Sequence, residues 1–419
     1  MIARGILDRL ATIVGEGGFV EHAPIEVGGA SLAVTLRPGD GEALSRSLDA
    51  LSACGMAALI RGGGNRLGVG NLASRGDAFL STERMSGVDE FEPAEGVCHV
   101  RAGTRLADAR EVVRAGGWEF PLDAPGDTAT CGGVLAAAAV GPRALGFGRP
   151  RDLVLGLEVT LATGERTRCG GRVVKNVTGY DLNKLYTGSF GSLGVIEGAW
   201  LRLRPLPERT SVFRAEASNL EGMCARGLAA ARCSSARAVA IDVEMRGSQR
   251  AVELVVELAG DAATVEADAV LLQEQGETAP AAAGALDRIR RRQERATSSS
   301  GLPFLRFCID VLPSRMEVAL AKLCERCTGV LVYPGLGLLY AELDLVRGDA
   351  SEVEMSFYFI EVIARNAGGG WRCESAPKSV KAGRDVFDTS PETLAVSRDL
   401  KRRFDPGGVL NPGRFAGRI

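Results

Sequence analysis

The stretch RGGGNRLGVG, positions 61–70, contains five glycines and two arginines. Glycine permits the backbone dihedrals in which successive N–H groups form a concavity, and it lets phosphate oxygens approach them closely. Arg61 and Arg66 add positive charge beside that concavity. The combination favours a loop that binds a pyrophosphate, and a flexible surface loop stays open as the alternative. Neither the P-loop motif nor the G-x-G-x-x-G of a Rossmann turn fits its spacing.

Two more stretches rich in small residues follow. In PGDTATCGGVLAAAAVG, positions 125–141, two threonines precede the pair Gly132 and Gly133 and a run of alanines. A tightly packed helix would explain the alanines, but not the turn before them. The stretch GSFGSLG, positions 188–194, has glycine at every third position. Because a long flat ligand excludes large side chains over many positions, the three stretches together predict a dinucleotide that lies extended across them.

The elements around these stretches alternate between helix and strand. Leucines at 44, 48 and 51 have helical spacing, and positions 56–61 read as a buried strand directly before the first glycines. A helix capped by Thr104 is expected to end at Gly116. Further strands are expected at 97–103, at 152–169 in two parts around a turn, and at 195–205. Residues 1–207 therefore predict one domain of mixed helices and strands.

Residues 208–385 predict a second domain of α+β type. From position 304 the patterns give strand, helix, strand, strand, helix, strand, which is the order of a ferredoxin-like split βαβ unit. Two alternating strands and a helix at 262–274 precede it. The basic run DRIRRRQER, positions 287–295, is expected to form a helix with a solvated face, and a specific acidic partner is the alternative.

Composition excludes several classes of protein. The 419 residues suit two or three domains, and 50 basic against 52 acidic residues give no electrostatic footprint for nucleic acid. No run approaches 18 apolar residues and no cleavage pattern follows the N-terminus, so we expect neither a membrane span nor secretion. Ten cysteines lack the spacing of a disulfide framework, and the one close pair, Cys324 and Cys327, is expected to decorate a helix. We expect reduced thiols, a cytosolic location and no metal site.

The stretches RGGGNRLG, TCGGVLA, GRPRDLVLGLEV and GYDLNKLYTGSFGSLGVI, in this order, resemble the FAD-binding domain of the vanillyl-alcohol oxidase and p-cresol methylhydroxylase (PCMH) family. The closing KRRFDPGGVLNPGRF resembles the C-terminal signature of that family. Within it, GGRVVKNVTGYDLNKLYTGSFGSLGVI and the compact length are most similar to the FAD-binding E subunits of bacterial glycolate oxidase. The resemblance implies an α+β fold: a two-part PCMH-type FAD-binding domain at 1–207, a ferredoxin-like cap at 208–385, and a segment at 386–419 that returns to the FAD site.

The resemblance also assigns cofactor-binding residues. They are Arg61, Gly62, Gly63, Gly64, Asn65, Arg66, Leu67, Thr128, Thr130, Cys131, Gly132, Gly133, Gly194, Val195, Ile196 and Asn411. In this assignment 61–67 wrap the pyrophosphate of FAD, 128–133 form a second wall, 194–196 meet the adenine end, and Asn411 closes over the flavin. Valine at Gly63 or Gly132 is accordingly expected to cost FAD affinity more than fold stability.

Asn65 bears on how FAD is held. Relatives that bind FAD covalently through this loop have a histidine at the equivalent position, because an imidazole nitrogen can bond to the flavin. An amide cannot do so. The resemblance therefore implies non-covalent FAD.

The cap departs from the related 2-hydroxyacid dehydrogenases, whose cap histidines place a base, and often a metal, beside the substrate. This chain has only His22 and His99, both before the cap, and His99 is expected to be a packed strand residue. Removing hydride from a 2-hydroxy acid needs a proton acceptor near neutral pH, so the catalytic residues stay unassigned. Among the lysines considered for that role, Lys378 and Lys381 read as surface charges and Lys175 as a residue that orders a loop near the cofactor.

Two function classes stay open. The first is the FAD-binding subunit of a glycolate or D-lactate dehydrogenase complex, with a catalytic flavoprotein and an iron-sulfur subunit as partners at the cytoplasmic face of the membrane. Its flavin would have an electron-transfer or structural role. The second is a self-sufficient FAD-linked dehydrogenase of a small hydroxy acid. The missing cap histidines favour the first class, and the intact glycines disfavour a scaffold that has lost FAD.

Overall fold

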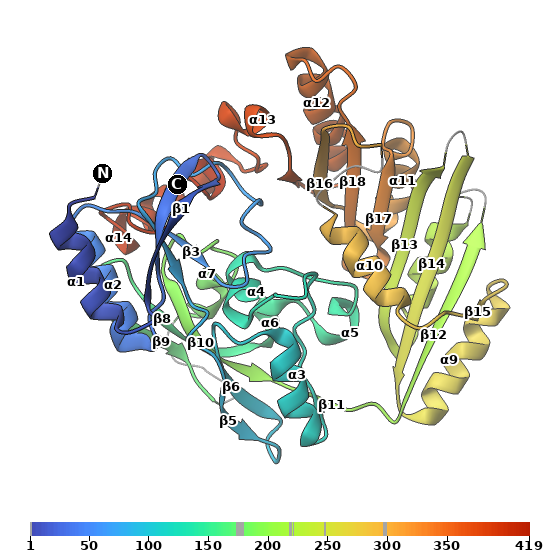
Figure 1. Ribbon diagram of the computed structural model, residues 1–419. Helices are drawn as coiled ribbons and strands as arrows, with labels where there is room; N and C mark the ends of the chain where they lie inside the picture. The colour runs from blue at the N-terminus through green and yellow to red at the C-terminus, as the bar shows by residue number, and fades with distance from the viewer. Residues whose placement is uncertain (1, 173–179, 218–219, 221, 247–248, 296–299) are drawn as a thin grey trace.

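The computed structural model describes residues 2–172, 180–217, 220, 222–246, 249–295 and 300–419. An N-terminal part with two main sheets lies beside a part built on one large sheet (Figure 1). The predicted division at 207 falls between the last strand of the first part and β12, where the large sheet begins.

The first sheet carries the glycine loop at its edge. Its strands are β1 (Phe19–Val27), β2 (Ala30–Leu36), β4 (Ala78–Ser81) and β3 (Ala58–Arg61), in that spatial order. Strand β4 is parallel to both of its neighbours, and β1 pairs antiparallel with β2. Helices α1 (Arg4–Val14) and α2 (Gly41–Ala53) bury their leucines against this sheet. Because β3 ends at Arg61, the glycines leave directly from the end of a buried strand.

The second sheet is antiparallel throughout. It contains β5 (Val88–Glu92), β6 (Val97–Arg101), β10 (Val195–Arg202), β8 (Val154–Thr160) and β9 (Arg166–Gly170), in that order. Its core is completed by α3 (Leu106–Ala115) and α4 (Cys131–Ala137). Short helices α5 (Ala144–Phe147), α6 (Pro150–Leu153) and α7 (Asn183–Tyr186) and a two-stranded pair, β7 (Trp118–Glu119) with β11 (Arg204–Pro205), complete this part.

The prediction that Thr104 caps a helix is wrong. Helix α3 begins at Leu106 after Arg105, and no side chain caps it. The Thr104 hydroxyl instead donates to the carbonyl of Gly87 at 3.0 Å and accepts from its N–H at 2.9 Å. A tertiary partner 17 residues away therefore takes the hydroxyl that the local pattern assigned to the helix end.

The large sheet consists of two split βαβ units placed edge to edge. The first unit is β12 (Arg209–Ala217), α8 (Met223–Ala230), β13 (Ala236–Arg246), β14 (Gln249–Gly260), α9 (Ala262–Glu274) and β15 (Ala279–Pro280). The second is β16 (Phe304–Asp310), α11 (Met316–Leu323), β17 (Gly329–Tyr333), β18 (Leu338–Asp344), α12 (Ala350–Asn366) and β19 (Trp371–Ser375). The strand order β15-β12-β14-β13-β17-β18-β16-β19 joins the units through antiparallel pairing of β13 with β17. The ferredoxin-like order predicted from position 304 is therefore confirmed, and it occurs twice.

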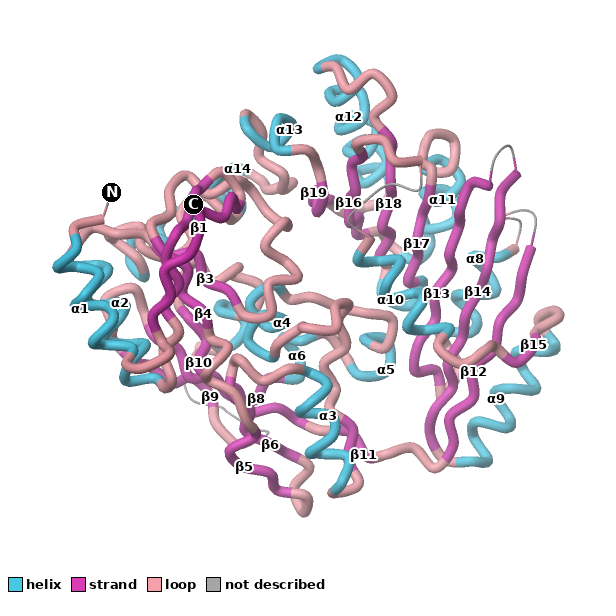
Figure 2. The backbone as a smooth tube through the Cα atoms, in the orientation of Figure 1, coloured by secondary structure: helices cyan, strands magenta, loops and turns pink. Residues whose placement is uncertain are grey.

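The two faces of this sheet have different neighbours, as the tube in Figure 2 shows. Alternate residues such as Val330 and Val332 of β17 pack against α8, α9, α11 and α12. Leu331 and Tyr333 point to the other face, toward α5 and α10 (Ala285–Glu294). Strand alternation thus separates an apolar outer layer from a face turned toward the N-terminal part.

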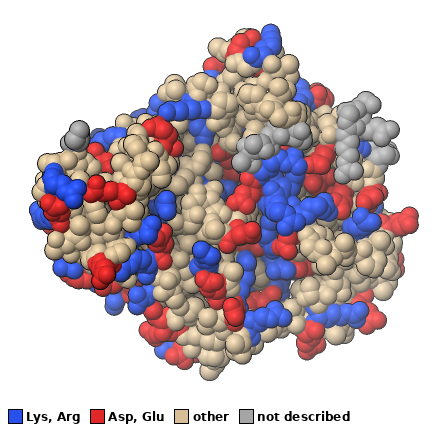
Figure 3. All heavy atoms as spheres, viewed as in Figure 1, with Lys and Arg blue, Asp and Glu red and all other residues tan. Residues whose placement is uncertain are grey.

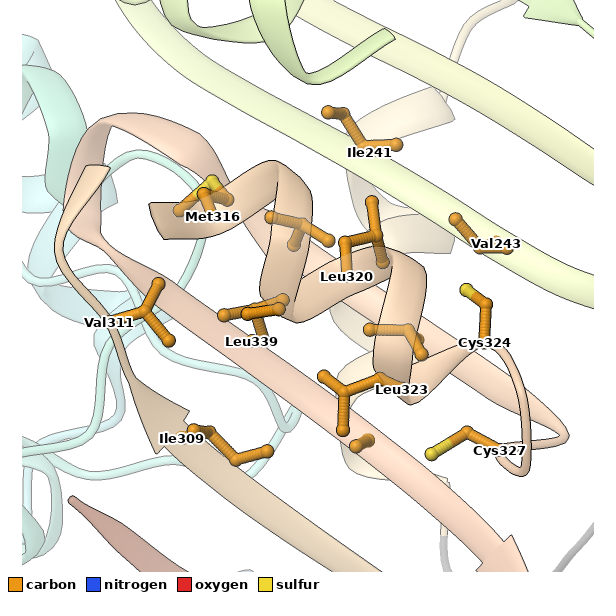
Figure 4. Packing of buried hydrophobic residues seen from close by; sticks show 14 of the residues in the cluster. Ile241, Val243, Ile309, Val311, Met316, Leu320, Leu323, Cys324, Cys327 and Leu339 are labelled. Atoms are coloured by element: carbon orange, nitrogen blue, oxygen red, sulfur yellow. The ribbon is translucent and has the colours of Figure 1, made fainter. Parts of the chain in front are cut away.

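Cys324 and Cys327 lie in the apolar outer layer. Cys324 follows the last residue of α11, Cys327 lies in the turn after it, and both pack among Leu320, Leu323 and Val243 (Figure 4). Burial raises the pKa of both thiols. All ten cysteines lie among the described residues and are free.

The basic run of α10 is solvated only in part, which narrows the expectation from its composition: Asp287, Arg288 and Arg291 are exposed, but other arginines are not. The side chains of Arg290 and Arg292 are 14% and 5% exposed. Arg290 Nη2 lies 2.8 Å from Asp123 Oδ1 of the N-terminal part, and Arg292 Nη1 lies 2.5 Å from Glu342 Oε1 of β18. The basic groups therefore form a cluster over α10 between the two parts, with acidic residues beside it (Figure 3).

The C-terminal segment returns to the first sheet. After α13 (Lys378–Ala382) and α14 (Pro391–Phe404), the N–H of Ala58 donates to Val409 O at 2.7 Å and that of Asn411 donates to Ala58 O at 3.0 Å. The buried Lys401 ammonium anchors this return through Ser192 O, Asp405 Oδ2 and Leu410 O. In the described part of the chain, no helix has the length and apolar character needed to cross a membrane.

Candidate FAD-binding site

A cleft lies where the three small-residue stretches meet. One side is the loop after β3, the opposite side is α4 with the turns that flank it, and the start of β10 forms the floor. The predicted site residues that line it are Arg61, Gly62, Gly63, Gly64, Asn65, Arg66, Leu67, Thr130, Gly132, Gly133, Gly194, Val195, Ile196 and Asn411. That these residues contact FAD stays a prediction.

Two predicted site residues do not line the cleft. Thr128 lies behind the loop, where its hydroxyl hydrogen-bonds to Gly63 O and to Asn65 Oδ1. Cys131 is 1% exposed and packs in the core of the second sheet, where burial raises the pKa of its thiol well above the ordinary value. Thr128 therefore supports the loop from outside, and Cys131 supports the wall from behind.

Close packing between the walls is what fixes glycine at three positions. A Cβ at Gly63 would overlap the carbonyl oxygen of Thr128, and a Cβ at Gly62 would overlap the hydroxyl of Thr130. At Gly132 it would lie 2.6 Å from Cβ of Ala102. The expectation that valine at Gly63 or Gly132 chiefly blocks the ligand is therefore corrected, because the new side chain would meet protein atoms first.

The cleft presents donors that fit an anionic ligand. The Nε atoms of Arg61 and Arg66 are buried and have no hydrogen-bond partner within the described residues. Both arginines line the cleft beside the bare backbone of 62–64. Unpaired buried donors are costly, and a diphosphate would supply the missing acceptors. The residues present therefore fit the pyrophosphate of a dinucleotide.

The Asn411 side chain connects two of the segments that line the cleft. Its Oδ1 accepts from the N–H of Ile60 at 2.8 Å, and its Nδ2 donates to Phe190 O at 2.6 Å. Both Asn411 and Phe190 have positive φ, at 45° and 56°. Such conformations are strained for residues other than glycine and persist where surrounding contacts enforce them. One side chain thus holds the end of β3, the third small-residue stretch and the C-terminal segment in register.

Lys381 is buried under the glycine loop, which corrects its prediction as a surface charge. Its Nζ donates to Gly68 O at 2.6 Å and to Gly70 O at 3.1 Å, and burial lowers its pKa. Lys378, in contrast, is exposed as predicted, with Glu26 Oε2 3.5 Å away. Lys175 lies outside the described residues.

We expect Lys381→Met to lower the free energy of unfolding by about 1.5–3 kcal/mol, because it removes charged hydrogen bonds and leaves two loop carbonyls unpaired. The same change should weaken FAD binding, since the loop that forms one wall loses its support. Urea denaturation and FAD titration measure the two effects. Lys378→Met is the matched control, expected to stay within about 0.5 kcal/mol. Equal behaviour of the two variants would contradict a supporting role for Lys381.

The cap contacts the glycine loop at two points. Asn65 Nδ2 donates to Glu294 Oε1 of α10 at 3.1 Å, and Arg66 Nη2 donates to Glu374 Oε1 of β19 at 2.9 Å. Glu374 is fully buried and also receives the guanidinium of Arg372 at 2.9 Å. Burial raises the pKa of Glu374, but the charges of Arg66, Arg372 and Arg306 outweigh it and hold that pKa at about 2. Glu374 is therefore an ionised carboxylate held between the cap and the glycine loop.

Neither histidine lines the cleft. His99 is buried in β6, with its ring centroid 5.3 Å from that of Trp200 and the two planes tilted by 54°, which confirms its prediction as a packed strand residue. His22 lies in β1, with Nε2 2.9 Å from the hydroxyl of Thr35. Among the described residues no group of three or more His, Cys, Asp or Glu side chains is arranged to hold a metal ion.

The sequence interpretation missed several lining residues. Those outside the assigned set are Ile60, Thr82, Ala102, Ala124, Pro125, Ala129, Val134, Ala136, Ala137, Ala139, Phe190, Gly191 and Arg414. Most lie within the stretches already singled out for small side chains, so widening each motif would have found them. Thr82 and Ala102 follow strands β4 and β6 and carry no local signal; only the fold brings them to the cleft.

The fold is that of PCMH-type flavoproteins, with an FAD-binding domain and an α+β cap, and the cofactor is FAD. Residues 32–170 match the FAD binding domain family. The solved structure of p-cresol methylhydroxylase with substrate bound is similar over 98% of this chain and 96% of that chain, with a TM-score of 0.73 at 14% identity.

Three relatives are similar to this chain in sequence. It is 37% identical over 139 residues to glycolate oxidase subunit GlcE of Escherichia coli (strain K12), covering 33% of this chain and 40% of that protein. It is 36% identical over 172 residues to D-lactate dehydrogenase of Archaeoglobus fulgidus, covering 41% of this chain and 39% of that protein. It is 27% identical over 422 residues to glycolate oxidase subunit GlcD of Bacillus subtilis (strain 168), covering 91% and 88%. The first two matches thus span about two fifths of the relatives' own length.

Proposed function

We propose that this chain is the FAD-binding subunit of a complex that oxidises glycolate or D-lactate, with its flavin in an electron-transfer or structural role. The observation that supports this role most strongly is the charge pairing of the cap on the side turned toward the N-terminal part. That side carries the ion pairs of Glu374 and Glu342 with arginines, and the cap sequence contains no histidine. When bound, FAD supplies the two-electron redox chemistry; the described residues of the cap offer no evident base to accept the proton of a substrate hydroxyl.

Four described groups that could replace the missing histidine are engaged or have a pKa shifted in the wrong direction. Burial raises the pKa of Tyr333 and Tyr340 far above 10, so both phenols stay protonated. Burial raises the pKa of Asp242 to about 6, but Arg292 Nε lies 3.4 Å from its carboxylate and α10 covers it. Lys381 donates to two loop carbonyls. The chemistry of the site therefore favours a subunit over a self-sufficient enzyme.

The relatives support the substrate class and the presence of partners. Two are named as glycolate oxidase subunits and one as a D-lactate dehydrogenase. The family resemblance of the sequence adds the rest of the proposal: the chain works beside a catalytic flavoprotein and an iron-sulfur subunit, at the cytoplasmic face of the membrane. The similarity to GlcE, together with the missing cap base, favours an E-type subunit; the long match to GlcD is the argument for the alternative, a self-sufficient FAD-linked 2-hydroxyacid dehydrogenase.

Anaerobic titration tests this proposal. The purified chain with FAD is mixed with glycolate and with D-lactate, and the flavin absorbance near 450 nm is followed. We expect no bleaching with the isolated chain and bleaching once the copurified partner subunits are present. Bleaching of the isolated chain at a rate matching turnover would overturn the subunit role and establish the self-sufficient enzyme.

We further expect FAD to be held without a covalent bond. Position 65 is an asparagine, and its amide is engaged by Glu294 and Thr128. Acid precipitation should therefore release intact, yellow FAD into the supernatant, where absorbance and chromatography identify it. Flavin that remains in the pellet would contradict this.

A further inference from the structure

An apolar groove lies on the outer face of the cap, between α11 and α12. Met316, Leu320 and Leu323 turn one side of α11 into the core (Figure 4), which leaves the opposite side of the helix to solvent. The groove is lined by Val318, Met355, Tyr358 and Val362, whose exposed fractions are 63%, 53%, 68% and 37%. Exposed apolar side chains gathered in one place are typical of a surface that another molecule covers.

The rim of this groove is basic. Arg315, Lys322 and Arg326 line it, and no acidic residue does. Lys322 Nζ lies 2.8 Å from Glu325, whereas Arg315 and Arg326 have no ion pair within the described residues. Arg326 lies over the ring of Phe359, 5.1 Å from its centroid. The groove therefore offers apolar contact along its length and unpaired positive charge at its edge.

We propose that the groove between α11 and α12 binds an amphipathic helix of a partner protein, with acidic residues flanking its apolar stripe. An apolar stripe at helical spacing would cover Val318, Met355 and Tyr358, and flanking carboxylates would pair with Arg315 and Arg326. The inference rests on the proposed function in one respect, since a subunit of a complex needs such a contact. It assigns that contact to the face opposite the FAD cleft.

A second copy of this chain is the alternative occupant. Helix α9 exposes Val270 and Leu271 and carries Glu266 and Glu274, so it has the required chemistry. Because α9 lies on the same face of the large sheet as α11 and α12, a closed two-fold dimer would need each α9 to reach the groove of the other copy at the same time. We commit to a different protein, because the proposed function needs such a partner, and crosslinking to this same chain is the outcome that decides against it.

Site-specific photo-crosslinking tests the proposal in the full-length chain, expressed in the organism that encodes it. Benzoylphenylalanine replaces Tyr358 in the groove or, as the control, Val396, which is 60% exposed on α14. After irradiation, mass spectrometry maps the crosslinked segment. We expect position 358, and not 396, to crosslink to one protein at a segment with apolar residues at helical spacing and acidic residues beside them. Crosslinks to this same chain, to lipid or to no defined segment would overturn the proposal.

Charge reversal makes the test specific for the rim. With Tyr358 as the crosslinking position, Arg315→Glu combined with Arg326→Glu should lower the crosslink yield by about tenfold, because the acidic helix would meet like charge. Circular dichroism and FAD content check that this variant is folded. An unchanged crosslink yield in a folded variant would contradict a role for Arg315 and Arg326 in binding the acidic helix. A crosslink to an acidic helix of a protein that is not a dehydrogenase subunit would support the groove proposal and overturn the proposed function. Flavin bleaching that depends on partner subunits, without any crosslink at position 358, would support the proposed function and overturn the groove proposal.

Discussion

Replacing Glu374 with alanine is expected to lower the free energy of unfolding by about 3–5 kcal/mol, the cost typical of leaving buried charges without their partner. The Glu374 side chain is completely buried, and its Oε1 lies 2.9 Å from Arg66 Nη2 and 2.9 Å from Arg372 Nη2. Arg66 belongs to the glycine loop and Arg372 to β19, so the loss should also loosen the cap from the cleft. Urea denaturation measures the stability, and FAD titration measures the consequence for the site.

The effect of this group on stability should depend on pH. Because the folded pKa of Glu374, about 2, lies below its ordinary value of 4.5, its charge stabilises the fold above pH 4.5 and that contribution is lost as pH falls toward 2. The stability difference between the wild-type chain and Glu374→Gln should therefore shrink between pH 7 and pH 3. Glu216→Ala is the control: its exposed pair with Arg214 is worth about 0–1 kcal/mol. A wild-type advantage that stays constant with pH would refute the assignment of charge to Glu374.

The parts of the fold that sequence could predict are those whose signals are local. The six elements from 304 to 375 alternate strongly enough to give the second split βαβ unit in full. The first unit has the same order, but β12 is half exposed and α8 contains small residues and an internal glycine, so their periodicity is weak. Repetition of the unit became visible only in the strand order of the sheet.

The parts that could not be predicted depend on contacts between distant positions. Lys381 and Gly68 are 313 residues apart, and Arg292 and Glu342 are 50 apart. From composition alone, a lysine near a helix end or five arginines in one run are expected to be solvated, because exposed charges are the usual case. Here the counter-charges arrive from other elements, and burial becomes possible through pairing.

The small-residue motifs combine a property that the sequence predicts with one that it does not. Their glycines located the cleft correctly, because bare backbone is a local property. Which atom each glycine makes room for is a tertiary property: at Gly63 it belongs to the facing loop, and at Gly132 to the residue that follows β6. A motif thus predicts where a cleft forms before it shows how each residue serves it.

Gly63→Val is therefore expected to destabilise the fold itself, rather than to leave a chain of normal stability that only lacks FAD. Its Cβ would overlap the backbone oxygen of Thr128, and a backbone neighbour cannot move away as a flexible side chain can. Overpacking of this kind costs roughly 1–3 kcal/mol or more, a large share of the stability of a typical domain. Gly132→Val should behave alike, since its Cβ would lie 2.6 Å from Ala102 Cβ and 3.1 Å from Ala102 backbone atoms.

Gly68→Val is the matched control in the same loop. No heavy atom lies within 4 Å of the Cβ position at Gly68, and its φ is not positive, so valine there should fold normally. Soluble yield and thermal unfolding without added FAD distinguish the variants, because a defect of ligand binding alone would not appear in the absence of ligand. Gly63→Val that folds like wild type and lacks only FAD would restore the view that this glycine exists for the pyrophosphate. Loss of stability at 63 and 132, with a normal Gly68→Val chain, would show that contact between the walls fixes these glycines.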